Sequence, residues 1–185
     1  MARLVLVLLV LAALDAGAQS PAAPPMSRPD VSVRPGGLET PHVTITASSM
    51  PAAAAPGAKV SLFLDIAPKP KMHVYSPLQE NYIPVSLTLE PNRAFRAHTP
   101  VFPKGEKYFF APLKETQLVY SKPFRIVQSV TLGSASALRE AGQKPGTTLT
   151  VGGTLRYQAC DDAICYLPKT LPISWVIELK PSAMQ

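Results

Sequence analysis

The sequence predicts an all-β protein of the immunoglobulin-like, antiparallel β-sandwich class. Composition is the first indication: 21 of the 185 residues are proline, about twice the average share, and proline is poorly tolerated inside helices and central strands. Periodicity is the second: apolar and polar residues alternate in several short segments that Pro and Gly separate. With 46% hydrophobic and 16% charged residues, the chain can form one folded domain.

The N-terminus predicts an exported protein. Arg3 precedes an unbroken apolar run from Leu4 to Leu14, and the small residues Ala16-Gly17-Ala18 follow, which is the pattern of a secretory signal peptide. This run is too short to span a bilayer, which needs about 20 residues. We therefore expect residues 1–18 to be a signal peptide, and the mature chain to be secreted without a membrane span.

The segment after the signal peptide predicts no stable structure. Residues 19–41 are mostly Pro, Ala, Ser and Gly, and they offer too little apolar surface to bury. We expect a disordered leader over 19–41 and the folded domain over 42–181. A second Pro- and Ala-rich patch, residues 50–57, predicts a loop between strands.

Within 42–181 the period-two pattern locates the strands. Ile173, Trp175, Ile177 and Leu179, for example, share one face of an expected strand. The segment 134–141 has helical character, and Gly152-Gly153 predicts a bulge or a turn. The expected strands cover residues 43–46, 60–66, 85–89, 117–120, 124–132, 147–159 and 173–179.

The formal net charge of +6 predicts a solvated surface and no nucleic-acid partner. The basic residues occur singly and form no block of the kind that follows a phosphate backbone. Such a surface can still favour acidic partners through weak electrostatic steering.

The two cysteines are the candidates for chemistry. Cys160 and Cys165 are five positions apart, and disulfides persist in exported proteins. If residues 161–164 form a four-residue hairpin loop, the cysteines face each other with Cα atoms about 4.5 to 5.5 Å apart, which suits a disulfide. Closing so short a loop stabilises a fold by only about 2 kcal/mol. The spacing alone leaves a structural staple and a redox-active pair about equally open.

Metal binding is the weaker alternative for these cysteines. His42, His73 and His98 have no metal-ligand spacing relative to them, so we expect no zinc site. A Cu(I)-handling chaperone that uses the reduced cysteines stays open as a hypothesis, because thiolate and thioether ligands suit Cu(I). We expect neither a metal nor an organic cofactor.

The residues around the cysteines resemble those of the N-terminal periplasmic domain of the thiol:disulfide interchange protein DsbD. The similarity is most specific at Tyr157-Gln158-Ala159-Cys160 and at Cys165-Tyr166-Leu167-Pro168, which resemble the family's Tyr-Gln-x-Cys and Cys-Tyr-x-Pro boxes. Lys71 to Ser76, Ile83 to Val85 and Phe102 to Gly105 support it more weakly. The resemblance covers about residues 44–179 and implies an immunoglobulin-like redox module.

The resemblance also implies a function in the periplasm. The family's domain takes electrons from a membrane-embedded partner by way of a thioredoxin-like domain, and it reduces oxidised client proteins. Carried over, Cys165 would form the mixed disulfides, Cys160 would resolve them, and the disulfide would be the only redox group. The four-residue spacing departs from the five residues of the best-known member, so the loop geometry and the potential can differ.

The family's membrane and thioredoxin-like domains have no counterpart in this sequence, so we expect a separate electron donor. We expect a monomer that acts as a protein-disulfide reductase or electron-transfer component. The alternative is a non-enzymatic immunoglobulin-like binding module whose hairpin disulfide is structural.

A shielding loop is a further implication of the resemblance. The matching stretch is 107–111, in which Tyr108, Phe109 and Phe110 are candidates to cover the cysteines. Phe109 and Phe110 are adjacent, so a strand would point one inward and one outward, and the outward ring is the candidate cap.

Six further residues are predicted to neighbour the pair. Because carboxylates disfavour thiolates, the two aspartates between the cysteines predict a reducing potential. The neighbours are His73 and Tyr75 at strand spacing, Tyr157 and Tyr166 flanking the cysteines, and Asp161 and Asp162 between them.

Overall fold

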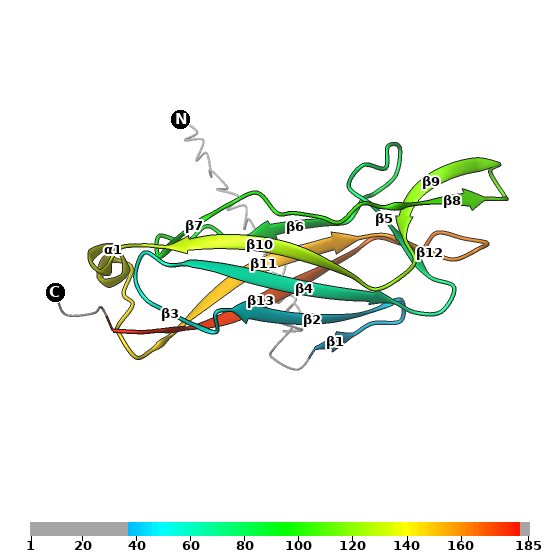
Figure 1. Cartoon of the computed structure of the whole chain (residues 1–185). Coiled ribbons are helices and arrows are strands. Elements are labelled where there is room, and N and C mark those ends of the chain that lie inside the picture. The colour runs from blue at the N-terminus through cyan, green and yellow to red at the C-terminus, as the bar shows by residue number, and fades with distance from the viewer. Residues whose placement is uncertain (1–36, 182–185) are drawn as a thin grey trace, which may run out of the picture. The chain divides into compact units, whose positions relative to one another are not determined.

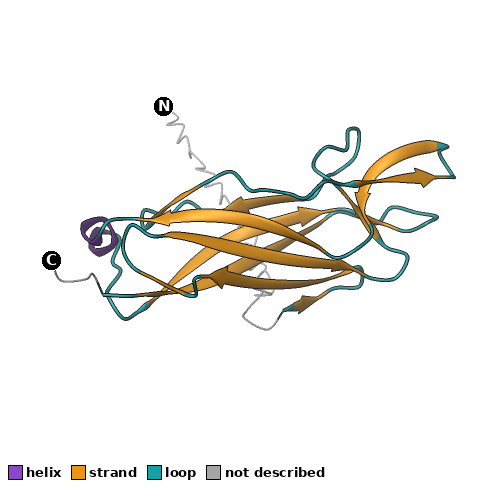
Figure 2. Ribbon diagram, in the orientation of Figure 1, coloured by secondary structure: helices purple, strands orange, loops and turns teal. Residues whose placement is uncertain are grey.

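The computed structural model describes residues 37–181 (Figure 1). The predicted signal peptide and the first part of the predicted leader lie outside the described residues. The secondary structure of the described part is mostly antiparallel strands, with one short helix, so the all-β sandwich prediction is confirmed (Figure 2).

The first sheet has five strands. Its centre is formed by β4, which pairs over residues 61–68 with β2 on one side and over residues 59–66 with β10 on the other. In order across the sheet, the strands are β1 (Leu38–Glu39), β2 (Val43–Met50), β4 (Lys59–Pro68), β10 (Phe124–Leu132) and β7 (Phe95–Ala97).

The second sheet has four strands and faces the first across the core. Its only parallel pair is β3 with β13. In order, its strands are β3 (Ala53–Ala54), β13 (Lys169–Leu179), β11 (Thr148–Tyr157) and β6 (Ser86–Leu89).

A third, smaller sheet carries the cysteines. It projects from one end of the sandwich, whereas α1 (Ala135–Glu140) lies at the other end (Figure 1). In order, its strands are β12 (Ala159–Cys160), β5 (His73–Tyr75), β9 (Glu115–Tyr120) and β8 (Glu106–Phe110).

The core confirms the alternation predicted for the last strand. Ile173, Trp175, Ile177 and Leu179 are all at most 2% exposed. The Trp175 indole N–H donates to the Phe63 carbonyl of the opposite sheet at 2.9 Å, so the one polar atom of this side chain is satisfied.

The structure differs from the sequence predictions at short strands and at one glycine pair. β3 forms within the expected loop 50–57 because its backbone pairs with β13, and β1 forms near the end of the predicted leader because its backbone pairs with β2. The predicted bulge or turn at Gly152-Gly153 is wrong, since β11 stays in regular register there. A Cβ on Gly153 would lie 2.9 Å from the Thr88 carbonyl oxygen, so the glycine allows β6 to approach closely.

Candidate functional site

The disulfide predicted between Cys160 and Cys165 is present and closes a hairpin. The two residues form an antiparallel bridge, and their Cα atoms are 4.0 Å apart, closer than the expected range. The Asp161 N–H donates to the Ile164 carbonyl, and the Tyr166 N–H donates to the Ala159 carbonyl, each at 2.9 Å. The four-residue loop is therefore a closed turn with backbone hydrogen bonds on both sides of the sulfur bridge.

The two cysteines differ sharply in exposure. Cys160 ends β12 and is 1% exposed, whereas Cys165 follows the loop and is exposed. Ile164 and Leu167, at 55% and 83% exposed, flank Cys165 with apolar surface. The hairpin therefore presents Cys165, and not Cys160, at the surface.

The Asp161 carboxylate stabilises the loop. One of its oxygens accepts the N–H groups of Ala163 and Ile164 at 2.8 Å, and the other accepts the Tyr166 hydroxyl at 2.8 Å. These hydrogen bonds, the backbone ones first, lower the pKa of Asp161. Asp161 is therefore ionised near neutral pH, and its carboxylate holds the loop through these hydrogen bonds.

Tyr75 brings a hydroxyl to both sulfurs. Its phenol oxygen lies 3.2 Å from Sγ of Cys165 and 3.3 Å from Sγ of Cys160, and in the disulfide state only the phenol can donate. Burial raises the pKa of Tyr75 to about 12, with smaller contributions from Tyr82 and Glu115. The phenol thus keeps its proton at neutral pH and can donate it in a hydrogen bond to a thiolate.

Three residues that the sequence analysis did not identify support Tyr75. The Tyr82 ring stacks on the Tyr75 ring with 4.4 Å between centroids, and its hydroxyl donates to the Glu115 carboxylate. The Gln117 amide donates to the same carboxylate at 2.8 Å. Tyr82 lies in a loop without periodicity, so no sequence signal indicated its contribution.

His73 lies beside Cys160. The β5–β12 register places the two residues directly opposite each other, and the imidazole is 1% exposed. Its ring packs against Tyr108 with 4.4 Å between centroids. Burial lowers the pKa of His73, and the carboxylates of Asp162 and Asp161 partly oppose this effect.

The three predicted shielding residues lie on different faces of β8. Tyr108 contacts the site: its hydroxyl donates to Asp162 at 2.6 Å, and this hydrogen bond is the main cause that raises the pKa of Tyr108 to about 12. Phe110 is on the same face and buried, at 5% exposed. Phe109 is the outward ring, 62% exposed, and strand alternation places it on the face away from Tyr108.

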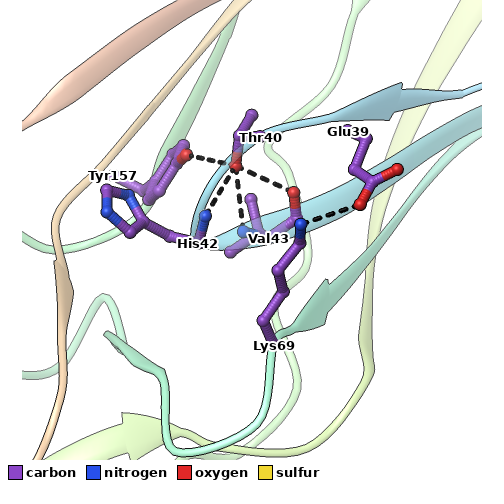
Figure 3. Close-up of polar contacts among 6 residues, drawn as sticks. All are labelled: Glu39, Thr40, His42, Val43, Lys69 and Tyr157. Atoms are coloured by element: carbon purple, nitrogen blue, oxygen red, sulfur yellow. Dashed lines mark hydrogen bonds and ion pairs between the residues drawn. The ribbon is translucent and has the colours of Figure 1, made fainter.

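The segment before β2 contacts the two tyrosines that flank the cysteines. The hydroxyls of Thr40 and Tyr157 are hydrogen bonded at 3.2 Å, and the Thr40 hydroxyl also accepts the N–H groups of His42 and Val43 (Figure 3). The His42 ring packs on Tyr166 with 4.4 Å between centroids. Tyr157 is thus held by Thr40, which the sequence analysis assigned to the leader. Tyr166 is held by His42, which the sequence analysis considered only as a metal ligand.

Gly105 has a steric role next to β5. A Cβ at this position would lie 2.8 Å from Cβ of Ser76 and 2.9 Å from its Oγ, which is too close for any side chain. The glycine lets the chain entering β8 pass the residue that follows Tyr75.

Residues 37–181 contain neither a candidate metal-binding cluster nor a candidate membrane-spanning helix. No group of three or more His, Cys, Asp or Glu residues in this part is arranged to hold a metal ion. No helix in the same range is long and apolar enough to cross a membrane.

Comparisons with known proteins identify one family. The profile of the N-terminal domain of the thiol:disulfide interchange protein DsbD matches residues 44–175. A search of curated proteins finds no match. Among solved structures, the chain is similar to the N-terminal periplasmic domain of ScsB from Proteus mirabilis, with a TM-score of 0.46 and 14% identity over 75% of this chain and 49% of that one. It is also similar to the reduced N-terminal domain of DsbD from Neisseria meningitidis, with a TM-score of 0.40 and 15% identity over 62% and 74%. The chain thus spans about half the length of the ScsB domain structure.

Proposed function

The chain belongs to the family of the N-terminal domain of the thiol:disulfide interchange protein DsbD, and on this basis we propose that it is a periplasmic module relaying electrons to oxidised client proteins. Its donor would be a thioredoxin-like or membrane protein. The observation that carries the proposal is the asymmetric disulfide, with Cys165 exposed, Cys160 buried and the Tyr75 hydroxyl against both sulfurs.

Reduction begins with the donor's thiolate attacking Sγ of Cys165. A bond forms between the donor sulfur and Cys165, the Cys160–Cys165 bond breaks, and the electron pair leaves on Cys160 as a thiolate. The donor's second thiolate then attacks its own first sulfur and releases Cys165. Two electrons have moved, and the donor dithiol has become a disulfide.

Client reduction runs the same chemistry in the other direction. The Cys165 thiolate attacks a client disulfide and forms a mixed disulfide, with a client thiolate leaving. Cys160 then attacks Cys165, which re-forms the hairpin disulfide and releases the client as a dithiol. Cys165 is the contact sulfur in both half-reactions because it is the exposed one.

Tyr75 would assist both half-reactions by stabilising the leaving or attacking thiolate. Hydrogen bonds to charged groups are worth about 1.5–3 kcal/mol, more than those to neutral ones. A phenol that keeps its proton at neutral pH and lies 3.3 Å from Cys160 is suitably placed for this.

Tyr108 is the side chain best placed to shield the pair. Its hydrogen bond to Asp162 joins β8 to the loop between the cysteines, and its ring covers His73. Phe109 points the other way, so we assign the shielding role to Tyr108. Breaking the Tyr108–Asp162 hydrogen bond would release β8 from the loop between the cysteines.

A redox titration combined with trapping tests the proposed function. We expect the pair to titrate reversibly in the folded domain at a reducing potential, well below the about −120 mV of a strong periplasmic oxidant. Cys160→Ala should trap a thioredoxin-like protein through Cys165, and Cys165→Ala should trap none. A disulfide that resists reduction until the domain unfolds, with neither variant trapping a partner, would instead support a structural staple in a binding module.

A further inference from the structure

His73 is a buried titratable group that these exchange steps do not use. It lies on β5 directly opposite Cys160 on β12 and is 1% exposed. Side chains of directly paired residues share one face of a sheet, with Cβ atoms about 4.5–5.5 Å apart. The imidazole of His73 and the sulfur of Cys160 are therefore neighbours on the face that carries Tyr75.

The surroundings of His73 leave one ring nitrogen unused. The ring packs on Tyr108 and meets the edge of Tyr75, and within residues 37–181 its Nε2 has no hydrogen-bond partner. Burial, the largest effect, lowers the pKa of His73, so the imidazole is neutral and able to accept a proton near pH 7. The titratable groups facing it are Tyr75 on its own strand, Tyr108 from β8, Cys160 from β12, and Asp161 and Asp162 from the hairpin loop.

Cys160 needs a base when it acts as the resolving cysteine. Only the thiolate is a nucleophile, and both burial and nearby carboxylates disfavour the thiolate form. At 1% exposed, Cys160 is also shielded from water that could remove its proton. A neutral imidazole beside the thiol meets this need, as in other Cys–His pairs.

We propose that His73 is the general base that deprotonates Cys160 in the resolving step, an inference that rests on the proposed function. The Cys160 thiol gives its proton to the imidazole, and the resulting thiolate attacks Sγ of Cys165 in the mixed disulfide. The Cys160–Cys165 bond forms, the bond between Cys165 and the client breaks, and the electron pair leaves on the client sulfur. In the opposite direction the imidazolium returns the proton to Cys160.

The reactions of the two cysteines can be distinguished by their rates when the reduced protein is mixed with one equivalent of 5,5′-dithiobis(2-nitrobenzoate). Attack by Cys165 releases the first thionitrobenzoate, and attack by Cys160 on the mixed disulfide releases the second. We expect His73→Gln to keep the first phase within about threefold and to slow the second about 100-fold at pH 7. In the wild type, the rate of the second phase should depend on pH as the neutral fraction of an imidazole does. In the variant, this rate should rise about tenfold per pH unit, in proportion to the fraction of Cys160 present as thiolate.

Two further variants keep the experiment decisive. His73→Phe retains an aromatic ring against Tyr108 without a basic nitrogen, and it should reproduce the slow second phase if His73→Gln fails to fold. His98→Gln removes a histidine that is hydrogen bonded to Thr131 away from the cysteines, and both phases should stay at wild-type rates. A normal first phase with an unchanged second phase in the folded His73 variants would overturn the role of His73 alone. Absence of the first phase in the wild type would overturn the exchange function as well.

Discussion

The ring of His42 packs against the ring of Tyr166, with 4.4 Å between their centroids and 32° between their planes. Tyr166 in turn donates its hydroxyl to Asp161, whose carboxylate holds the loop between the cysteines. A residue just before β2 is thus connected to the disulfide hairpin through two side-chain contacts. The hairpin depends on the N-terminal edge of the domain as well as on its own hydrogen bonds.

Replacing His42 by Ala should loosen the hairpin. The change removes a buried ring from the face of Tyr166, so we expect the free energy of unfolding to fall by about 1–2 kcal/mol. Backbone amides of residues 161–166 should exchange with solvent faster than in the wild type. Urea unfolding and hydrogen exchange measure the two effects. As a control, Glu39→Gln breaks only the exposed ion pair with Lys69 and should leave the amide exchange of residues 161–166 unchanged. If these amides exchange as slowly in His42→Ala as in the wild type, the hairpin does not depend on His42.

Tyr75→Phe should slow disulfide exchange without unfolding the domain. The change removes the hydroxyl that lies 3.2 and 3.3 Å from the two sulfurs but keeps the ring stacked on Tyr82. Losing a hydrogen bond to a thiolate costs about 1.5–3 kcal/mol, so reduction by dithiothreitol should slow about ten- to a hundredfold. Stopped-flow kinetics give the rate. Tyr120→Phe removes a hydroxyl that donates to the Pro103 carbonyl away from the cysteines, and it should react at the wild-type rate. Equal rates in both variants would exclude a role for the Tyr75 hydroxyl.

The oxidised domain should lose stability as the pH falls below about 6.5. Burial is the first cause that lowers the pKa of both His42 and His73 in the folded state, with Lys169 and Lys69 adding to it at His42. Unfolded histidines titrate near 6.5, so in acid the unfolded chain binds protons that the folded chain does not. The stabilising effect is therefore complete above pH 6.5 and falls by at most about 1.4 kcal/mol per pH unit for each histidine. Urea midpoints at pH 7.5, 6.5 and 5.5 test this. The urea midpoint of the double variant His42→Gln, His73→Gln should depend less steeply on pH than that of the wild type. An equal pH dependence in the two proteins would show that these histidines do not cause the loss of stability in acid.

The strands of the sandwich could be predicted because each has one face in the core. Alternation in β4, β10 and β13 follows directly from that burial, and proline content already excluded a helical bundle. Two-residue strands such as β1 and β3 have no period to detect, and they form only because a neighbouring strand offers backbone partners. The regular course of β11 through Gly152-Gly153 depends on how closely β6 approaches, which a sequence does not contain.

Sequence reasoning predicted those parts of the candidate site that depend on residues close together in the chain. The hairpin disulfide follows from two cysteines five positions apart, and the placement of His73 and Tyr75 on one face follows from strand spacing. Other contacts join segments far apart in the chain. Tyr82 reaches Glu115 across 33 positions and Thr40 reaches Tyr157 across 117. Tertiary pairing alone creates such contacts, so Tyr82, Glu115 and Thr40 carried no sequence signal, whereas Tyr157 was predicted from its position beside the cysteines.

Asp162→Asn should increase the reactivity of Cys165. Asp162 is exposed in the loop between the cysteines, and its negative charge disfavours the Cys165 thiolate. The amide oxygen of Asn can still accept the Tyr108 hydroxyl, so the change removes charge while keeping the hydrogen bond. Interactions between exposed charges are worth about 0.2–1 kcal/mol, so alkylation of reduced Cys165 by iodoacetamide at pH 7 should rise about two- to fivefold.

The salt dependence separates this charge effect from loosening of Tyr108, the residue proposed to shield the cysteines. At 1 M salt the screening length is about 3 Å, so the difference between Asp162→Asn and the wild type should nearly vanish if it is electrostatic. An increase that persists at 1 M salt would mean instead that the amide fails to hold Tyr108 and that Cys165 has become more accessible. Asp65→Asn removes a carboxylate that is paired with Arg125 on the first sheet, and it should leave the alkylation rate unchanged at either salt concentration. Alkylation no faster than in the wild type at low salt would show that the Asp162 charge does not suppress the thiolate, which would remove the basis for expecting a reducing potential from this loop.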